Sequence, residues 1–286
     1  MALERIQKVL AAAGFGARRF CEQLVLDGRV AVNRDIVRTL PVMVDPEIDH
    51  ITVDGKPVRS ERPVYYLLNK PQHVYCTGSD PAGRTRAVDL LVGVRERVFP
   101  VGRLDAESMG LLLLTNDGAL AQRLTHPRYG IPKTYRAEVV GVPAPETLQR
   151  VRSGIWLAEG KTAPAVIKIT HKQRDMAVLE ITLREGRNRE VRRMLARLGH
   201  KVRRLTRICM GELSIRGLPL GAFRKLKPAE VEHLQALAKR AEAAASASGG
   251  VRRAVGGMRK RRPAAEQAKG QRRPPRTRRI LAPDES

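Results

Sequence analysis

The first third of the chain alternates apolar and polar positions in two different periods. Residues 5–13 carry apolar side chains at helical spacing, and a second amphipathic run covers residues 18–26. Residues 29–33 alternate as a strand does, and a short β pair around residues 51–55 follows. The pattern predicts a small domain over residues 1–58, built from a helix-turn-helix and a β hairpin.

A second domain is predicted over residues 64–240, after a polar linker at residues 59–63 that ends in proline. Strand-like and helical runs alternate there, separated by glycine and proline turns. The predicted strands are residues 64–68, 111–114, 134–140, 165–169 and 177–183, and the predicted helices are residues 118–124, 145–153 and 189–198. This order predicts an α+β fold with a mixed, mainly antiparallel sheet.

The C-terminal part has a different composition. A helix rich in Ala, Glu and Leu is predicted from Lys227 to about Ala245. Residues 241–286 contain twelve basic and four acidic residues and almost no large apolar ones. Because such a segment buries too little apolar surface to order itself, we expect a disordered basic tail that contacts phosphates.

The charge of the chain indicates a polyanionic partner. Lys and Arg number 54 against 29 acidic residues, which gives a formal net charge of +25. Nucleic acid fits this charge best. No apolar run reaches the roughly 18 residues that cross a bilayer, and the N-terminus does not resemble a signal peptide, so we expect no membrane association and a cytoplasmic location.

Cysteine and histidine usage argues against a metal or a disulfide framework. The three cysteines, Cys21, Cys76 and Cys209, are far apart and odd in number. The six histidines show no ligand-like spacing. We expect reduced cysteines and no metal.

Basic residues gather at the turn between the first two helices. Arg5, Lys8, Arg18 and Arg19 lie at or beside this turn, where they could follow phosphates, although a solvated basic face is the simpler alternative. The motifs Arg5–Leu10, Ala13-Gly14, Arg18-Arg19 and Leu26–Asn33 resemble the RNA-binding domain first seen in ribosomal protein S-four. The resemblance favours RNA contact.

Asp105 lies in a loop with a strand before it and a fully apolar strand after it, within the segment Val101–Gly118. A rigid frame of this kind can present one short carboxylate as a nucleophile. The alternative for any aspartate in a glycine-bounded loop is a turn residue that caps backbone amides.

Two further segments supply groups that such a nucleophile would need on RNA. In Pro132–Val139, strand alternation places Tyr135 on one face, where it could stack on an extruded base or be a half-buried sheet aromatic. In Leu183–Met194, Arg187 could form a fork with a carboxylate and keep Asp105 ionised. The neighbouring Arg189, Arg192 and Arg193 suit phosphate contact or a solvated helix face.

These motifs occur together in a recognisable order. Gly102–Asp105, Gly110–Leu113, Lys133–Tyr135, Glu185–Arg187 and Val191–Met194 follow one another behind the N-terminal module, with Asn69–Pro71 and Asp80–Arg84 before them. The chain therefore resembles the ribosomal pseudouridine synthases of the RsuA and RluB class over roughly residues 5–235.

The resemblance implies a role for each matching position. Asp105 would be the nucleophile, Tyr135 the aromatic that stacks on the target uracil, and Arg187 the ion-pair partner of Asp105. Arg103 would fill the gap left by the flipped base. The reaction would be the isomerisation of a uridine in ribosomal RNA without a cofactor.

Some positions depart from the pattern of the relatives. Asn188–Glu190 replaces a common His-Gln pair and is most similar to the branch that modifies large-subunit ribosomal RNA. His73 stands where relatives usually have glycine, and Glu107–Met109 varies a Thr-rich turn. These changes could alter loop shape and substrate choice.

Two other functions remain as alternatives. A non-catalytic RNA-binding or ribosome-assembly factor could use the same modules, although binding alone does not need Asp105, Tyr135 and Arg187 together. A DNA-binding protein would leave the second domain unexplained. We expect ribosomal RNA as the partner, no obligate protein partner, and a monomer, since a short polar linker suits a flexible two-domain chain.

Overall fold

The computed structural model describes residues 3–255. The N-terminal part contains two helices and several short strands. Its elements are β1 (Glu4–Arg5), α1 (Ile6–Ala12), α2 (Arg18–Leu26), β2 (Val30–Val32), β3 (Asp35–Val37), β4 (Met43–Val44), β5 (Ile51–Val53) and β6 (Lys56–Pro57). The helix-turn-helix and the following strands are thus present as predicted, and β2 and β5 belong to a four-stranded sheet in the order β3-β2-β5-β6.

The helices and the sheet of this part enclose a small apolar core. Ile6 and Leu10 of α1, Leu24 and Val25 of α2 and Val30 of β2 are at most 3% exposed. Helical spacing places Ile6 and Leu10 on one face of α1, and this face packs with Leu24 and Val25 of α2.

The elements that follow alternate strands and helices. They are β7 (Tyr65–Lys70), η1 (Ala87–Leu90), β8 (Phe99–Pro100), β9 (Met109–Thr115), α3 (Gly118–Thr125), η2 (Pro127–Tyr129), β10 (Lys133–Val140), α4 (Pro145–Ser153), β11 (Trp156–Leu157), β12 (Gly160–Lys161), β13 (Val166–Lys172), β14 (Met176–Leu183), α5 (Glu190–Arg197), β15 (Val202–Met210), β16 (Leu213–Ser214), β17 (Phe223–Lys225) and α6 (Pro228–Val255). The α+β class and the mixed, mainly antiparallel sheet are confirmed.

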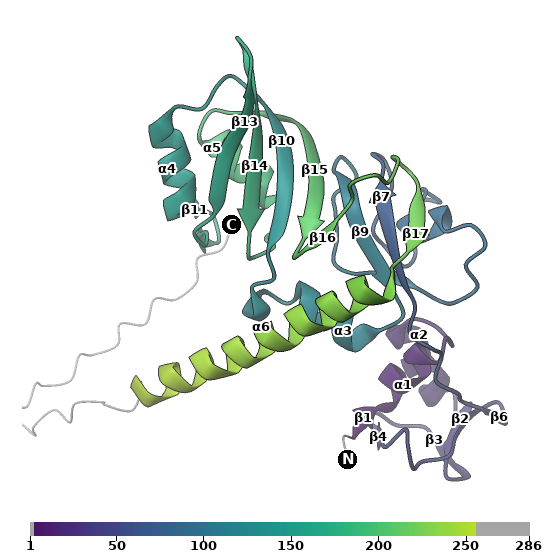
Figure 1. Cartoon of the computed structure of the whole chain (residues 1–286). Coiled ribbons are helices and arrows are strands. Elements are labelled where there is room, and N and C mark those ends of the chain that lie inside the picture. Colours follow the sequence, from purple (N-terminus) through teal and green to yellow (C-terminus); the bar gives the residue numbers. More distant parts are fainter. Residues whose placement is uncertain (1–2, 256–286) are drawn as a thin grey trace, which may run out of the picture. The chain divides into compact units, whose positions relative to one another are not determined.

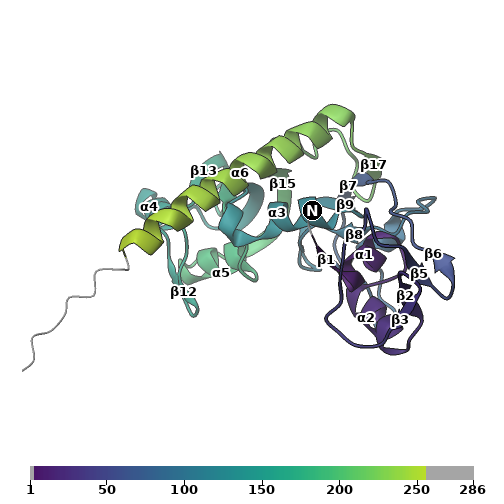
Figure 2. The same ribbon diagram turned by 90° about the horizontal axis from the view of Figure 1, so that it is seen from below.

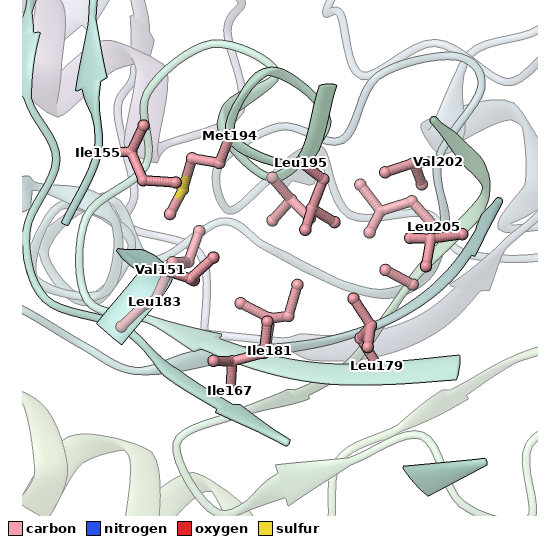
Figure 3. Close-up of a cluster of buried hydrophobic side chains, with 14 of the residues drawn as sticks. Val151, Ile155, Ile167, Leu179, Ile181, Leu183, Met194, Leu195, Val202 and Leu205 are labelled. Atoms are coloured by element: carbon pink, nitrogen blue, oxygen red, sulfur yellow. The ribbon is translucent and has the colours of Figure 1, made fainter. Parts of the chain in front are cut away.

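A nine-stranded sheet organises this part, with the main order β13-β14-β10-β15-β9-β7-β17 (Figure 1). The half made of β13, β14, β10 and β15 is antiparallel throughout. Helices α4 and α5 pack on it through Val151, Met194 and Leu195, which meet Ile167 and Ile181 of the strands (Figure 3).

The other half is formed by β7, β9 and β17, and its central strands are buried on both faces. One set of alternate side chains, including Leu67 and Leu113, packs against α3 and α6, which lie on the same side of the sheet (Figure 2). The other set, including Leu68 and Leu112, packs with η1 and with Leu104. Continuous burial explains why β9 is an uninterrupted apolar run in the sequence.

The two halves meet where β9 pairs with β15 in parallel, through Met109 opposite Thr206 and Gly110 opposite Arg207. Gly110 has a φ of +101°, and a Cβ placed there would lie 2.3 Å from the carbonyl oxygen of Arg207. Arg207 is 2% exposed, and its Nε donates to the carbonyl oxygen of Leu111 at 2.7 Å. The junction therefore requires glycine on one strand and is reinforced by a buried guanidinium from the other.

The last helix is longer than the sequence predicted, because α6 ends at Val255 instead of near Ala245. The extension covers residues 246–255 and includes Gly249 and Gly250, so helix propensity does not account for it. Residues 256–286 lie outside the described part, so the disordered basic tail stays a prediction there. Among the described residues, no helix combines the length and apolarity that a membrane crossing requires.

Replacing Gly110 by alanine is expected to lower the free energy of unfolding by at least about 2 kcal/mol, because the new methyl group meets the backbone of β15 and the φ is unfavourable for alanine. Urea-induced unfolding followed by circular dichroism measures the change. Gly78→Ala is the matched control, since Gly78 faces open space and has no positive φ. Equal stability of the two variants would show that the junction tolerates a side chain.

Candidate active site

A pocket of about 370 Å³ opens at the junction of the two half-sheets. The loop before β9 contributes Arg103 and Asp105 to one wall. The opposite wall carries Tyr135 of β10 and the turn Gly186–Val191 between β14 and α5. The three residues predicted to be catalytic, Asp105, Tyr135 and Arg187, therefore line the same pocket although they lie far apart in the sequence.

The loop that carries Asp105 is supported from behind by Lys70. Lys70 is fully buried, and its Nζ donates to two backbone carbonyls at 2.8 Å and lies 3.5 Å from the carbonyl oxygen of Ala106. Burial lowers the pKa of Lys70, and the neighbouring Cys76 and Asp105 partly oppose this shift. The backbone N–H of Ser108 donates to the carbonyl oxygen of Asp105 at 3.0 Å. The position of the carboxylate is thus fixed by contacts within the loop and beneath it.

His73 also holds this loop, since its backbone N–H donates to the carbonyl oxygen of Ala106 at 2.7 Å. Its φ is +62°, in the left-handed region that glycine adopts at lower cost. This conformation accounts for the glycine that the resemblance led us to expect at position 73. The histidine adopts this conformation at some energetic cost.

The predicted ion pair between Arg187 and Asp105 is not formed in this structure, so this prediction is wrong. Arg187 donates through Nε to Glu185 at 3.0 Å and through its two terminal nitrogens to the carbonyl oxygens of Gly160 and Lys161, at 2.8 and 2.5 Å. Glu185 is only two residues from Arg187 in the sequence. Pairing between them therefore costs less chain entropy than pairing of Arg187 with the distant Asp105. Arg187 thus ties the pocket wall to the β11–β12 hairpin.

Arg189 faces Asp105 instead. Its Nη1 lies 3.7 Å from Oδ2 of Asp105, and its Nη2 donates to Glu107 at 2.9 Å. The backbone of Arg189 has a φ of +47°, an unusual value for a long side chain, immediately before α5. Backbone strain of this kind is common at functional sites. Here it occurs at Arg189, whose guanidinium faces the carboxylate of Asp105.

The other predicted arginines differ in their surroundings. Arg192 lies beside Glu107, with its Nε 3.8 Å from the carboxylate, and burial lowers its pKa. Arg193 is paired with Glu159. Arg103 is exposed at the pocket and has no ion-pair partner among the described residues. Arg189, Arg192 and Arg193 each lie beside a carboxylate. Phosphate contact by these three arginines stays a prediction.

Tyr135 presents an aromatic ring beside an apolar wall. The residue is half-buried and packs against the cores of both half-sheets. Leu183 and Leu205 line the same pocket. A flat apolar ligand such as a nucleobase can therefore stack in this pocket.

A pair of glutamates lies under the turn and was not anticipated from the sequence. Glu190 is 4% exposed, lines the pocket and accepts the backbone N–H of Arg187 at 3.1 Å. Burial, together with a hydrogen bond shared with Glu185, raises the pKa of Glu190 to about 8. Glu185 accepts the backbone N–H of Ala163 at 2.6 Å as well as the Arg187 side chain. Glu190 is therefore the member of the pair that keeps a proton to higher pH.

Lys133 is a second buried group that sequence reasoning left without a role. Its Nζ donates to the carbonyl oxygen of Ile131 at 3.1 Å. Burial and the nearby Arg207 lower its pKa to about 8, and Glu190 partly offsets the shift. Lys133 and Glu185 belong to the motifs Lys133–Tyr135 and Glu185–Arg187, but the sequence assigned no role to their side chains.

Three of the four basic residues predicted to bind RNA in the N-terminal part lie together. Arg5, Lys8 and Arg18 line a groove of about 380 Å³. Lys8 is paired there with Glu4 at 2.5 Å. Arg19 is exposed and does not line this groove.

The remaining expectations concern cysteines and metal ligands. Cys21, Cys76 and Cys209 are all free, as predicted. No group of His, Cys, Asp or Glu side chains suited to hold a metal ion occurs within residues 3–255.

Family comparison matches two parts of the chain. Residues 64–197 match the model of the RNA pseudouridylate synthase family, and residues 4–47 match the S4 domain. The first match contains the loop of Asp105 and the turn before α5. The second contains the two N-terminal helices.

Individual relatives cover most of the chain. It is 46% identical over 238 residues to the ribosomal large subunit pseudouridine synthase B of Bacillus subtilis, which covers 82% of this chain and 97% of the relative. It is 47% identical over 232 residues to an uncharacterized RNA pseudouridine synthase of Aquifex aeolicus, and the match covers 80% of this chain and 93% of the relative. A solved structure of a pseudouridylate synthase is 28% identical, with a TM-score of 0.59, and covers 80% of this chain and 99% of that one.

The buried glutamate predicts a specific pH dependence of stability. Between the ordinary glutamate value near 4.5 and about 8, the folded protein keeps the proton of Glu190 and the unfolded chain loses it. The free energy of unfolding therefore falls as pH rises through this window. The lowered pKa of Glu185 acts below the window. Glu190→Gln, which mimics the protonated side chain, is expected to remove this part of the dependence.

Urea unfolding at both ends of the window measures the effect. Glu146→Gln on α4 is the control, because Glu146 is an exposed glutamate in the first turn of a helix. The assignment of the proton to Glu190 is contradicted if wild type and Glu190→Gln lose the same stability as pH rises.

Proposed function

The chain belongs to the RNA pseudouridylate synthase family, and we propose that it converts a specific uridine of large-subunit ribosomal RNA to pseudouridine, with Asp105 as the catalytic carboxylate. The convergence of Asp105, Tyr135 and Arg189 on one pocket carries this proposal. A volume of about 370 Å³ lies within the range of small-ligand sites and can hold an extruded nucleotide.

The reaction needs one positioned carboxylate and no redox step. The bond between N1 of uracil and C1′ of ribose breaks, and a bond from C5 to C1′ forms. C5 loses its proton and N1 gains one. In our proposal, Asp105 acts at the ribose or at the ring while the detached base stays in the pocket. Arg189 lies opposite this carboxylate, with its Nη1 3.7 Å from Oδ2 of Asp105.

The other pocket residues hold and replace the base. Tyr135 stacks on the extruded uracil, with Leu183 and Leu205 completing an apolar enclosure that retains the detached ring. Arg103, exposed at the pocket, occupies the space left in the RNA stack. Extrusion costs a few kcal/mol, and loops or bulges with unpaired bases reduce this cost.

Two observations support large-subunit RNA as the substrate. The Bacillus subtilis relative, at 46% identity, is named for the large subunit. The segment Asn188–Glu190, which presents Arg189 to Asp105, is also the variant that resembles the large-subunit branch. Transcripts of the two ribosomal RNAs, assayed separately with the purified protein, test this choice, and conversion of the small-subunit transcript alone would refute it.

The N-terminal part would supply sequence-independent affinity. The groove lined by Arg5, Lys8 and Arg18 suits phosphates of the same RNA. We place the boundaries of this domain at residues 1–58 and of the catalytic domain at residues 64–240, and we propose a cytoplasmic monomer. Size-exclusion chromatography with light scattering tests the oligomeric state.

Replacing Asp105 by alanine is expected to lower the release of tritium from RNA labelled at C5 of uridine by about a thousandfold or more, because this carboxylate makes the covalent or proton-transfer step possible. RNA binding should persist, since contacts to phosphates dominate affinity. A filter-binding assay at fixed salt measures it. Tritium release at the wild-type rate would instead support a non-catalytic RNA-binding factor that was contaminated by another enzyme.

Arginine variants test which guanidinium serves Asp105. Arg189→Gln is expected to lower kcat about tenfold to a hundredfold, because it removes the cation that faces the carboxylate. Arg187→Gln should chiefly lower thermal stability, since Arg187 holds the β11–β12 hairpin through Gly160 and Lys161. A large loss of kcat in Arg187→Gln with unchanged stability, and none in Arg189→Gln, would restore the pairing that the sequence suggested.

A further inference from the structure

Trp156, on β11, is exposed on the surface although tryptophan usually contributes to a core. The chain contains one tryptophan, and this residue is 64% exposed. Its neighbours Ile155 and Leu157 pack against the core of the half-sheet that carries α4 and α5. Strand alternation therefore turns the indole outward, and its exposure is a consequence of the local fold and not of loose packing.

The indole lies in a hollow with two unpaired cations. A pocket of about 280 Å³ is lined by Arg150 and Ser153 of α4, Trp156 of β11, and Arg197 at the end of α5. Arg150 and Arg197 are exposed, and neither has an ion-pair partner among residues 3–255. Arginine beside an exposed aromatic ring is the combination by which proteins hold unpaired nucleotides, with stacking on the ring and charge on the phosphates.

This hollow is mechanically connected to the active-site pocket. Arg187 donates to the carbonyl oxygens of Gly160 and Lys161 in the β11–β12 hairpin, and Arg193 of α5 is paired with Glu159 in the same hairpin. That pairing lowers the pKa of Glu159 to about 2, so Glu159 stays ionised and its negative charge is balanced by Arg193. The hairpin that carries Trp156 is therefore fixed to the turn that lines the active site.

Helix α5 sets the separation of the two sites. Its first residue, Glu190, lines the active-site pocket, and its last residue, Arg197, lines the hollow of Trp156. Eight residues of α-helix span about 12 Å. A strand of RNA whose target nucleotide lies in the active-site pocket can reach the hollow with a short flanking segment.

We propose that Trp156, Arg150 and Arg197 form a second binding site for the substrate RNA, which holds an unpaired nucleotide flanking the target uridine. The base stacks on the indole, and the two guanidinium groups contact its phosphates. Charge complementarity selects RNA as the occupant, because the described cations of the hollow are unpaired and Glu159 is engaged by Arg193. The inference rests on the proposed function for the identity of the RNA.

The single tryptophan gives a direct measurement, since the intrinsic indole fluorescence of the protein comes from Trp156 alone. The full-length Asp105→Ala variant is titrated with a large-subunit ribosomal RNA transcript, and quenching by acrylamide is measured with and without RNA. Stacking is expected to shield the indole and reduce the acrylamide quenching constant several-fold. An unchanged quenching constant at saturating RNA overturns the proposal.

Kinetics on the naked transcript provide the second test. Trp156→Ala is expected to raise KM for the RNA about tenfold, with a smaller effect on kcat, and Trp156→Phe should restore most of the affinity because a stacking ring remains. Leu220→Ala, which truncates an apolar side chain that is 60% exposed, is the matched control and should behave as wild type. Thermal unfolding verifies that each variant is folded.

The arginines have their own signature. Combined Arg150→Gln and Arg197→Gln should reduce the slope of log K against log salt by about 1.4, as expected for two lost phosphate contacts on a single strand. A slope equal to that of wild type overturns their role.

The outcomes separate this inference from the proposed function. If Trp156→Ala matches Leu220→Ala on naked RNA, the second site is refuted even if tritium release proceeds normally. A defect of Trp156→Ala on assembled ribosomal particles alone would also refute it, since that result indicates a protein partner. If wild type releases no tritium but RNA still shields Trp156, the proposed function fails and the RNA-binding site stands.

Discussion

The pocket exists because two half-sheets meet at one short parallel pairing. Gly110 of β9 approaches the backbone of β15 so closely that no side chain fits, and Arg207 seals the contact from within by donating to the carbonyl oxygen of Leu111. The loop that ends in β9 carries Asp105, and the strands of the opposite half carry Tyr135 and the turn before α5. Any change in the spacing of this junction would move the carboxylate of Asp105 relative to the ring of Tyr135, so the close-packed contact fixes the geometry of the pocket.

Electrostatic order in the site is established before any substrate arrives. The arginines of the turn and of α5 have carboxylate partners: Arg187 with Glu185, Arg189 with Asp105 and Glu107, and Arg193 with Glu159. Groups held in this way do not need to reorganise when charge develops during the reaction. The protonated Glu190 beneath the turn lets two glutamates share a buried position that two ionised carboxylates could not share. Substrate specificity can then reside in exposed groups outside this network, such as Trp156.

The periodicity of the chain anticipated much of the architecture. The helix predicted for residues 145–153 is α4 (Pro145–Ser153), and the apolar run at residues 111–114 lies within β9. Proline at a helix start, an N-cap aspartate such as Asp117 and continuous apolar strands are local signals, so they can be interpreted without knowledge of tertiary contacts. The convergence of Asp105, Tyr135 and Arg187 on one pocket was anticipated as well, but through the order of family motifs and not through any local pattern.

The sequence established which residue types were available for the site, and the folded chain selected their partners. Arg187 and Arg189 lie two residues apart in one arginine-rich segment, and the local pattern does not indicate which of them faces Asp105. Arg189 has a left-handed backbone conformation and faces Asp105. Arg187 instead donates to a carbonyl of the distant β11–β12 hairpin and has a structural role. Likewise, the raised pKa of Glu190 and the lowered pKa of Lys133 come chiefly from burial. Burial and ion pairing depend on distances between segments far apart in the chain, and such distances are absent from a one-dimensional pattern and arise only when the sheet has formed.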